Sequence, residues 1–324
     1  MKVVSDINQK LLDSETVGML SRIGDVRLSL LYDEQFLEEA KDADAIFLES
    51  KKIDDAVLEA APKLKIVARN GVGYDNVDVE ACTRHEVYVT NTPGVLSDAV
   101  ADLTLGFMLC LSRNLIELDR YAREQWASKG DFPKLGFDLK NKVCGVIGLG
   151  RIGFQVAKRV YAFGMRIIYC DISRNEKAEE LFDAERVGLD ELLRESDYVT
   201  VHVFLDKKTR GMIGRRELGL MKKTAFIINT SRGGVIDQAA LTQFLREHRI
   251  AGAGLDVFER EPIPSDDSIL KLDNLILAPH AGTSTNETRH AMALTAVRNI
   301  SAALRGDVPP DFVPEQKGKV FHKI

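Results

Sequence analysis

Residues Gly145–Gly153 read Gly-Val-Ile-Gly-Leu-Gly-Arg-Ile-Gly, so Gly148, Gly150 and Gly153 have the spacing Gly-x-Gly-x-x-Gly. The pattern is short, and an ordinary glycine turn can match it, so the flanking residues decide its meaning. The apolar run Val143–Ile147 before it is typical of a buried parallel strand, and the residues after it have the apolar spacing of a helix. This order of strand, glycine turn and helix predicts a dinucleotide-binding unit.

Each glycine of this stretch has its own physical role. Gly148 lets the chain turn sharply out of the strand, Gly150 lets the backbone approach a pyrophosphate, and Gly153 lets the helix pack close to the strand. The first helical turn, with Arg151 and Ile152, offers unpaired N–H groups and the positive end of the helix dipole. We expect these five residues to bind the cofactor.

A second apolar run ends in Asp171, about 20 residues beyond the glycines. A carboxylate at the tip of this strand accepts hydrogen bonds from ribose hydroxyls and repels a 2′-phosphate. The residue therefore predicts NAD rather than NADP as the cofactor. Arg174, three positions farther on, offers a positive charge that would offset part of this repulsion.

The composition is that of an ordinary globular protein with room for two domains. The chain has 324 residues, 45% of them apolar and 29% charged, and its net charge is −5 with both signs interspersed. This pattern indicates no nucleic-acid partner, and the apolar runs are too short to span a membrane. The N-terminus has no signal-peptide pattern, and the four cysteines form no Cys-x-x-Cys pair. We therefore expect reduced thiols in a cytoplasmic protein.

The order of predicted elements indicates two α/β domains. In the first hundred residues, strands are predicted at 3–5, 26–31, 45–48, 64–68 and 87–90, and helices at 8–23, 34–41, 54–61 and 77–84. Beyond the glycine motif, six strands are predicted at 143–147, 166–170, 198–203, 225–230, 252–258 and 275–279. Six strands with intervening helices fit a complete doubly wound sheet.

Two longer helices are also predicted. Ser97 is expected to cap a helix that runs to about residue 123. Its first half is apolar on most faces, so it needs burial at a domain interface, a subunit interface or both. A last helix, at about 286–304, is expected to return to the first domain, and Gly306–Ile324 is expected to be extended.

Ligands bind beyond the carboxyl ends of the strands in open parallel sheets. Three successive predicted strands end in Asn229–Gly234, Asp256–Pro262 and Ala278–Gly282. These ends bring an arginine, several acidic residues and a histidine to one edge of the sheet. His202 ends another strand and is a candidate either for shaping the cofactor loop or for a second base. His85, His248, His290 and His322 are expected at the surface, without metal-ligand spacing to cysteines or carboxylates, so we expect no metal site.

Several of these segments resemble the signature of one family, the D-isomer-specific 2-hydroxyacid dehydrogenases. The similar segments are Gly145–Gly153, Asn229–Asp237, Gly254–Pro262 and Pro279–Gly282 in the second domain, and Gly71–Asp78 and Asn91–Gly94 in the first. They occur in the family's order between about residues 45 and 305.

The resemblance implies an α/β fold of two doubly wound parallel-sheet domains. A Rossmann NAD-binding domain, residues 99–286, is inserted in a flavodoxin-like substrate domain formed by residues 1–98 and 287–324. It also implies reversible hydride transfer between NAD(H) and a small 2-hydroxy or 2-keto acid, and a homodimer formed through residues 97–125.

Reduction of a 2-keto acid needs a group that holds the carboxylate and a group that delivers a proton. Arg232 suits the first task because arginine stays charged and offers a planar fork of donors. His280 suits the second because the ordinary imidazole pKa of about 6.5 lets it exchange a proton near neutral pH. A carboxylate beside it would orient the ring. Position alone leaves Glu259 and Glu261 open, and the resemblance implies Glu261.

The resemblance also implies further contacts. His202, Thr230, Ser231, Asp256 and Gly282 are expected at the cofactor, with Asp256 facing the nicotinamide.

In the first domain, the backbone N–H groups of Val72 and Gly73 are expected to bind the substrate carboxylate. Arg69 precedes that turn, and it indicates either a second anionic group on the substrate or an arginine paired with a nearby aspartate. The first alternative is similar to phosphoglycerate dehydrogenases and points to 3-phosphoglycerate. The second fits glyoxylate or hydroxypyruvate reductases. Two other functions stay open on the same scaffold: an NAD(H)-sensing corepressor and a phosphite-type dehydrogenase.

Overall fold

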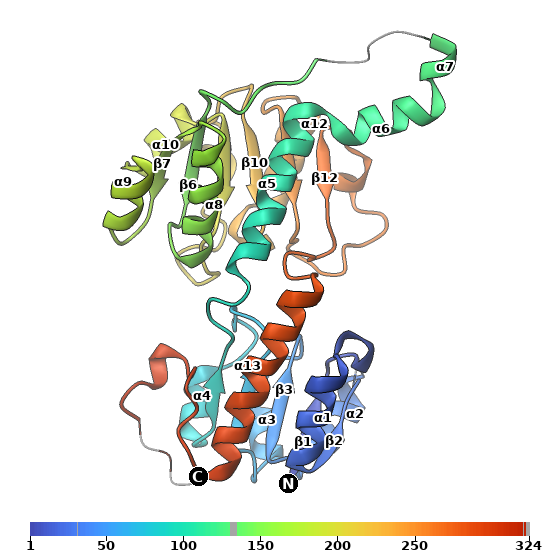
Figure 1. Ribbon diagram of the computed structural model, residues 1–324, viewed down its shortest axis with the longest axis vertical. Helices are drawn as coiled ribbons and strands as arrows, with labels where there is room; N and C mark the ends of the chain where they lie inside the picture. Colours follow the sequence, from blue (N-terminus) through green and yellow to red (C-terminus); the bar gives the residue numbers. More distant parts are fainter. Residues whose placement is uncertain (31, 130–134, 320, 322–324) are drawn as a thin grey trace. The chain divides into compact units, whose positions relative to one another are not determined.

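The computed structural model describes residues 1–30, 32–129, 135–319 and 321. The chain divides into two compact units (Figure 1). Unit 1 comprises Met1–Leu96 and Thr283–Ile324, and unit 2 comprises Ser97–Gly282. The chain thus crosses between the units just before the first long helix and just before the last one.

Unit 1 is built on a parallel sheet with the strand order β2-β1-β3-β4-β5 in its described part. The strands are β1 (Lys2–Ser5), β2 (Asp25–Arg27), β3 (Ala45–Leu48), β4 (Ile66–Arg69) and β5 (Tyr88–Thr90), and the helices between them are α1 (Ser14–Ile23), α2 (Asp33–Ala40), α3 (Asp55–Ala60) and α4 (Val79–Arg84). This is the flavodoxin-like order. The last helix, α13 (Asn286–Arg305), packs on β3 and β4, so the predicted return to the first domain is confirmed.

Two predicted elements of unit 1 have different limits in the structure. The predicted helix 8–23 is divided into a short 3-10 turn, Gln9–Leu11, and α1. Asp13 separates them because its carboxylate caps α1, accepting a hydrogen bond of 2.9 Å from the Thr16 N–H. The segment after α13 runs back along β5, where Phe312 bridges Thr90, and it includes a 3-10 turn at Pro314–Gln316.

Unit 2 contains a larger parallel sheet, whose described strands have the order β12-β11-β10-β9-β6-β7-β8. The strands are β6 (Val143–Ile147), β7 (Arg166–Cys170), β8 (Glu185–Arg186), β9 (Tyr198–Val201), β10 (Phe226–Asn229), β11 (Gly252–Leu255) and β12 (Leu275–Leu277); the helices are α8 (Arg151–Ala162), α9 (Glu176–Phe182), α10 (Leu189–Glu195), α11 (Arg215–Leu218) and α12 (Gln238–Arg246). Val146 and Ile147 pack into different apolar clusters, one on each face. The predicted α/β class with two doubly wound sheets is confirmed.

Sequence analysis missed one strand and misplaced one helix in unit 2. Strand β8 is two exposed charged residues, so it carries no apolar pattern. The single helix predicted to reach residue 123 is two helices, α5 (Ser97–Arg113) and α6 (Leu115–Glu124), with 57° between them. Asn114 makes the break, because its backbone is left-handed at φ 50°, which asparagine tolerates. Ser97 is a buried residue inside α5 rather than its cap.

The apolar face of α5 is buried within unit 2 itself. The helix packs on α8, β10 and β11, and Phe107 and Met108 enter the apolar core there. A short helix, α7 (Trp126–Lys129), follows α6. Among the described helices, none alone is long and apolar enough to cross a membrane, although α5 and α6 together pass that test by length and composition.

A cluster of charged side chains joins α1 to α13 in unit 1. The Nδ1 atom of His290 lies 2.8 Å from a carboxylate oxygen of Asp13, and its Nε2 atom lies 3.7 Å from one of Glu15. The expectation that no surface histidine lies at metal-ligand spacing to carboxylates was therefore wrong for His290. The spacing could not show it, because the two helices are far apart in the sequence. His322 lies outside the described residues.

The titration of this cluster predicts how stability depends on pH. The hydrogen bond to Asp13 raises the pKa of His290. Burial alone would raise the pKa of Asp13, but the hydrogen bonds from His290 and Thr16 lower it overall. The histidine contribution is thus complete below the ordinary value of about 6.5 and is lost as the pH rises through the folded value. The aspartate contribution is lost only as the pH falls below about 4.

We therefore expect His290→Gln to lower the Tm of unit 1 most at about pH 5 to 6, between the two titrations. The difference from the wild type should shrink toward pH 9, where the histidine is neutral in both states. Thermal unfolding followed by circular dichroism across this range measures the difference. A Tm difference that stayed constant with pH would contradict the assignment.

Candidate active site

The glycine loop after β6 is shaped so that only glycine fits at two of its positions. Gly148 has φ 90°, and a Cβ there would lie 2.9 Å from the His202 backbone. A Cβ on Gly153 would lie 2.1 Å from the Gly148 carbonyl oxygen. In contrast, a Cβ on Gly150 would meet no described atom within 4 Å. The loop is therefore tightly packed on its protein side and open at Gly150, which fits the close approach of a dinucleotide pyrophosphate.

The helix after this loop presents backbone donors. Gly150 caps α8, and Arg151, Ile152 and Gly153 form its first turn, where N–H groups have no carbonyl oxygen one turn back. Such a turn binds anions through these N–H groups and the helix dipole. The residues present thus fit the phosphates of a dinucleotide.

Asp171, at the end of β7, braces the same loop. One of its carboxylate oxygens accepts a hydrogen bond of 2.7 Å from the Leu149 N–H, and the other accepts one of 3.0 Å from Ser173. The side chain of Asn175 donates to the Leu149 carbonyl oxygen at 2.8 Å. The carboxylate therefore positions the glycine loop as well as standing where a ribose is expected.

Arg174 does not offset the negative charge of Asp171, because its guanidinium pairs with another carboxylate. Its guanidinium pairs with Glu179 of α9, with Nη2 at 2.6 Å and Nε at 2.7 Å from one carboxylate oxygen. The other oxygen accepts a hydrogen bond from the Tyr169 hydroxyl at 2.6 Å. The hydrogen bond from Arg174, with that from Tyr169, lowers the pKa of Glu179, so this carboxylate stays ionised. The geometry favours a cofactor without a 2′-phosphate.

His202 lies beside the glycine loop as a neutral ring. Its backbone N–H donates to Ile147 at 2.7 Å, and its Nε2 atom lies 2.7 Å from the Thr200 hydroxyl. Burial lowers the pKa of His202 to about 3. A ring with this pKa is a weak base at neutral pH, so the geometry supports the loop-shaping alternative rather than the second base.

The loop after β10 is organised by Asn229. Its side-chain oxygen accepts hydrogen bonds from the Ser231 N–H at 3.0 Å and hydroxyl at 2.9 Å, and its amide donates to the Arg232 carbonyl oxygen at 2.9 Å. Arg232 is half-buried, and its Nη1 donates to the Ser231 carbonyl oxygen. The Thr230 hydroxyl instead pairs with Thr104 of α5 at 2.9 Å. Sequence analysis missed Asn229 as an organiser, although an asparagine at a strand end is a signal for such local bonds.

His280 and Glu261 form a close pair. The His280 Nδ1 lies 2.7 Å from one Glu261 carboxylate oxygen, and the other oxygen accepts a hydrogen bond of 2.9 Å from the Phe258 N–H. Burial would raise the pKa of Glu261, but these hydrogen bonds and the charge of Arg232 lower it overall. Glu259 instead accepts a hydrogen bond from the Gln238 N–H. Of the two glutamates left open by position, Glu261 is the one that contacts the imidazole.

Asp256 holds the loop that carries this histidine. It is 1% exposed, and its two carboxylate oxygens accept hydrogen bonds from the N–H groups of Ala281 at 2.6 Å and Gly282 at 2.8 Å. Its carbonyl oxygen also accepts one from the His280 N–H at 2.8 Å. Burial raises the pKa of Asp256, although both backbone bonds act in the opposite direction. Both oxygens thus position the loop, and facing the nicotinamide stays a prediction.

Three of the predicted substrate residues lie in unit 1, where Arg69 is the last residue of β4 and Val72 and Gly73 follow it. Arg69 Nη1 donates to the carbonyl oxygens of Asn70 at 2.9 Å and Leu48 at 3.4 Å. Its guanidinium also covers the backbone of Gly71, where a Cβ would lie 3.1 Å from it. The Val72 carbonyl oxygen accepts a hydrogen bond from Asn91, and Gly73 is buried. These contacts make Arg69 a brace for the turn that carries Val72 and Gly73.

The described geometry defines a class of protein. A doubly wound sheet, a glycine loop at its topological switch point and a histidine–carboxylate pair at neighbouring strand ends are the parts of a nucleotide-dependent oxidoreductase. Residues 105–282 match the family model of the D-isomer specific 2-hydroxyacid dehydrogenase, NAD binding domain. The chain belongs to this family, and it is an NAD-dependent oxidoreductase that acts on CH–OH groups.

Full-length relatives agree with this assignment. A glyoxylate reductase of Korarchaeum cryptofilum is 48% identical and covers 88% of this chain and 86% of its own. The TT0316 protein of Thermus thermophilus has a TM-score of 0.88 and 36% identity over 97% of this chain and 100% of its own. A glyoxylate reductase from Paecilomyes thermophila has a TM-score of 0.87 and 32% identity over 98% of this chain and 99% of its own.

The two roles of Asp171 predict the effect of removing its carboxylate. We expect Asp171→Ala to weaken NADH binding about tenfold or more, because the loop brace and the ribose acceptor are both lost. NADPH binding should fall less, because a repulsive charge is also removed. Fluorescence titration with both cofactors measures the ratio, and Arg174→Ala serves as a control with little expected effect. An unchanged ratio in Asp171→Ala would show that another residue sets the preference.

Proposed function

We propose that this protein reduces a small 2-oxo acid of the glyoxylate or hydroxypyruvate type to the D-2-hydroxy acid, reversibly. The observation that carries the proposal is the 2.7 Å contact between His280 and Glu261, beside the loop of Arg232. Bound NADH supplies the hydride for the substrate carbon. The glyoxylate reductases among the relatives support this substrate class.

The proton comes from His280 in this proposal. Glu261 holds the Nδ1 side of the ring, which leaves Nε2 to donate the proton to the carbonyl oxygen. Because the pKa of Glu261 is lowered, its negative charge is present at neutral pH and stabilises the imidazolium. Asp256 fixes the backbone on which His280 stands. The His280–Glu261 pair, here called the proton relay, therefore needs no large movement of the histidine loop.

The substrate carboxylate is assigned to Arg232, and the binding role of the Val72 and Gly73 N–H groups stays a prediction from the resemblance. Arg232 offers a charged, planar fork that matches a carboxylate. Arg69 supports the turn through its bonds to Leu48 and Asn70, so no second anionic group on the substrate is required to explain it. This favours glyoxylate or hydroxypyruvate over a phosphorylated acid.

A panel of 2-oxo acids tests the assignment through NADH oxidation at neutral pH. We expect glyoxylate or hydroxypyruvate to give the highest kcat/KM, with phosphohydroxypyruvate and a bulky branched acid far lower. His280→Ala should reduce kcat by about 100-fold or more while NADH still binds, and Glu261→Gln should also reduce it. A preference for the phosphorylated acid would make Arg69 a substrate ligand. Normal turnover by His280→Ala would remove it as the proton donor.

We also propose that the protein works as a homodimer through residues 97–125 and their neighbours. Helix α6 has no buried residue in the described structure, and Ile116 and Trp126 are each 62% exposed. Figure 1 shows α6 and α7 extending away from the sheet of unit 2. Apolar side chains on such a projection are typical of a protein interface.

Light scattering after size exclusion tests the dimer. We expect Ile116→Glu to convert dimers to monomers, because a charge would be buried in the interface. Leu181→Glu on α9 is the control, since Leu181 is also exposed but lies outside α6 and α7. A dimer that survives Ile116→Glu unchanged would place the interface elsewhere.

We propose the cytoplasm as its location, without a nucleic-acid or membrane partner. The four cysteines, Cys82, Cys110, Cys144 and Cys170, are free thiols in the structure. Burial raises the pKa of Cys82 and of Cys144 to about 12, so both are unreactive. Free, unreactive thiols are ordinary in a reducing compartment.

A further inference from the structure

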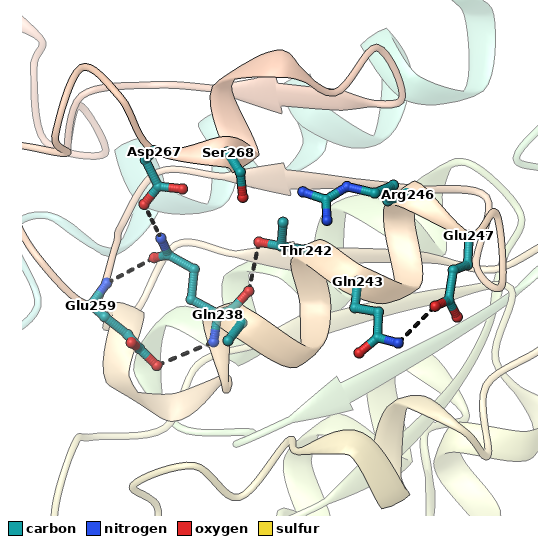
Figure 2. A pocket seen from close by; sticks show the side chains of 9 residues that line it. Gln238, Thr242, Gln243, Arg246, Glu247, Glu259, Asp267 and Ser268 are labelled. Atoms are coloured by element: carbon teal, nitrogen blue, oxygen red, sulfur yellow. Dashed lines mark hydrogen bonds between the residues drawn. The ribbon is translucent and has the colours of Figure 1, made fainter.

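Gln238, the first residue of α12, contacts the loop that carries Glu261 in three ways (Figure 2). Its side-chain oxygen accepts a hydrogen bond of 3.1 Å from the Glu259 N–H. Its own N–H donates to a Glu259 carboxylate oxygen at 3.1 Å. Its side-chain nitrogen donates to a carboxylate oxygen of Asp267 at 3.1 Å.

These contacts hold both ends of one loop, residues 259–267. Glu259 stands at its beginning, two residues before Glu261, and Asp267 stands at its end. Asp267 is fixed in turn, because its other carboxylate oxygen accepts from the Ile269 N–H at 2.9 Å and its N–H donates to the Pro264 carbonyl oxygen. One amide side chain therefore spans the loop that positions the partner of His280.

Only an amide side chain at position 238 can accept a hydrogen bond from Glu259 and donate one to Asp267 at the same time. The Glu259 N–H can only donate, so it requires an acceptor, and the Asp267 carboxylate requires a donor. A glutamate at 238 would keep the acceptor but place a third negative charge beside Glu259 and Asp267. The amide orientation is fixed by its two partners.

The bracing reaches Glu261 through two adjacent peptide units that share Phe258. The Phe258 N–H holds one Glu261 carboxylate oxygen, and the next N–H along the chain, that of Glu259, is held by Gln238. The other face of this peptide packs on Gly233, where a Cβ would lie 1.9 Å from the Phe258 carbonyl carbon. The 258–259 peptide is thus fixed between the Arg232 loop and Gln238.

We propose that Gln238 is a positioning residue for the proton relay, acting through residues 258–261 to keep Glu261 in contact with His280. This inference rests on the proposed function of that pair. Helix α12 thereby sets the geometry of a site to which it contributes no reacting group.

The surroundings of Gln238 allow it to be replaced without crowding the core. It is half-buried beside a hollow of about 550 Å³. The hollow is lined by Gln238, Ala239, Thr242, Gln243, Arg246, Glu247, Glu259, Asp267 and Ser268 (Figure 2). Gln243 is a matched control on the same helix, because its amide donates to Glu247 and does not contact the loop.

The test compares steady-state kinetics of Gln238→Ala and Gln243→Ala in the full-length enzyme. We expect Gln238→Ala to lower kcat about tenfold with a much smaller change in KM, because a misplaced relay affects the chemical step. The acidic limb of the pH profile for 2-oxo acid reduction should move to higher pH, since the contacts that lower the pKa of Glu261 would be weakened. Arg232 and Asp256 also act on this pair, but they are unchanged in both variants.

A polarity swap separates positioning from general destabilisation. Gln238→Glu should lower kcat because two carboxylates would face each other. Asp267→Asn should also lower it, because two amide nitrogens would face each other. The double variant Gln238→Glu with Asp267→Asn exchanges donor and acceptor between the two positions, and it should recover most of the lost kcat. Melting temperatures of all variants identify any loss of folding.

The outcomes are distinct. Equal kinetics of Gln238→Ala and Gln243→Ala would overturn the inference, and so would a loss of kcat with an unmoved pH profile and no recovery in the double variant. Glu261→Gln keeps the two proposals apart. If Glu261→Gln is impaired and Gln238→Ala is not, only the role of Gln238 fails; if Glu261→Gln is fully active, the relay itself fails.

Discussion

The geometry of the candidate site depends on one buried carboxylate, that of Asp256. A buried charge must be hydrogen-bonded, and here the partners are the backbone N–H groups of Ala281 and Gly282. This requirement folds the chain after β12 back against β11, with His280 at φ 54°. A left-handed backbone costs a non-glycine residue free energy, so it persists only where surrounding contacts enforce it. The position of the imidazole therefore follows from the satisfaction of Asp256.

The parallel sheet supplies the second constraint, because its register aligns the strand ends. Asn229 pairs with Leu255, and Leu255 pairs with Leu277, so the loops after β10, β11 and β12 leave the sheet at the same level. Arg232, Glu261 and His280 stand on these three consecutive loops. Each loop is held by a polar side chain that forms hydrogen bonds with its backbone. Asn229, Gln238 and Asp256 perform this task.

Much of this arrangement could be predicted from local sequence, and the rest could not, for physical reasons. The glycine spacing and the apolar strands carry periodic signals, so the nucleotide unit and six of its strands were identifiable. Strand β8 is exposed and charged, and the break at Asn114 depends on one backbone conformation, so neither leaves a pattern. The His290 cluster and the contacts of Gln238 join residues that meet only after folding. Arg69 stayed ambiguous because its carbonyl partners are backbone atoms.

Two carboxylates of the site, Asp256 and Glu261, show how surroundings separate the tasks of similar groups. Burial raises the pKa of Asp256, and both of its oxygens are committed to backbone donors. The pKa of Glu261 is lowered, because the imidazole, the Phe258 N–H and the charge of Arg232 outweigh its burial. Both oxygens of Asp256 are bound by backbone N–H groups, so neither contacts the imidazole. One oxygen of Glu261 contacts the imidazole and can stabilise its positive charge. The first carboxylate thus holds the backbone of the histidine loop, and the second contacts the imidazole itself.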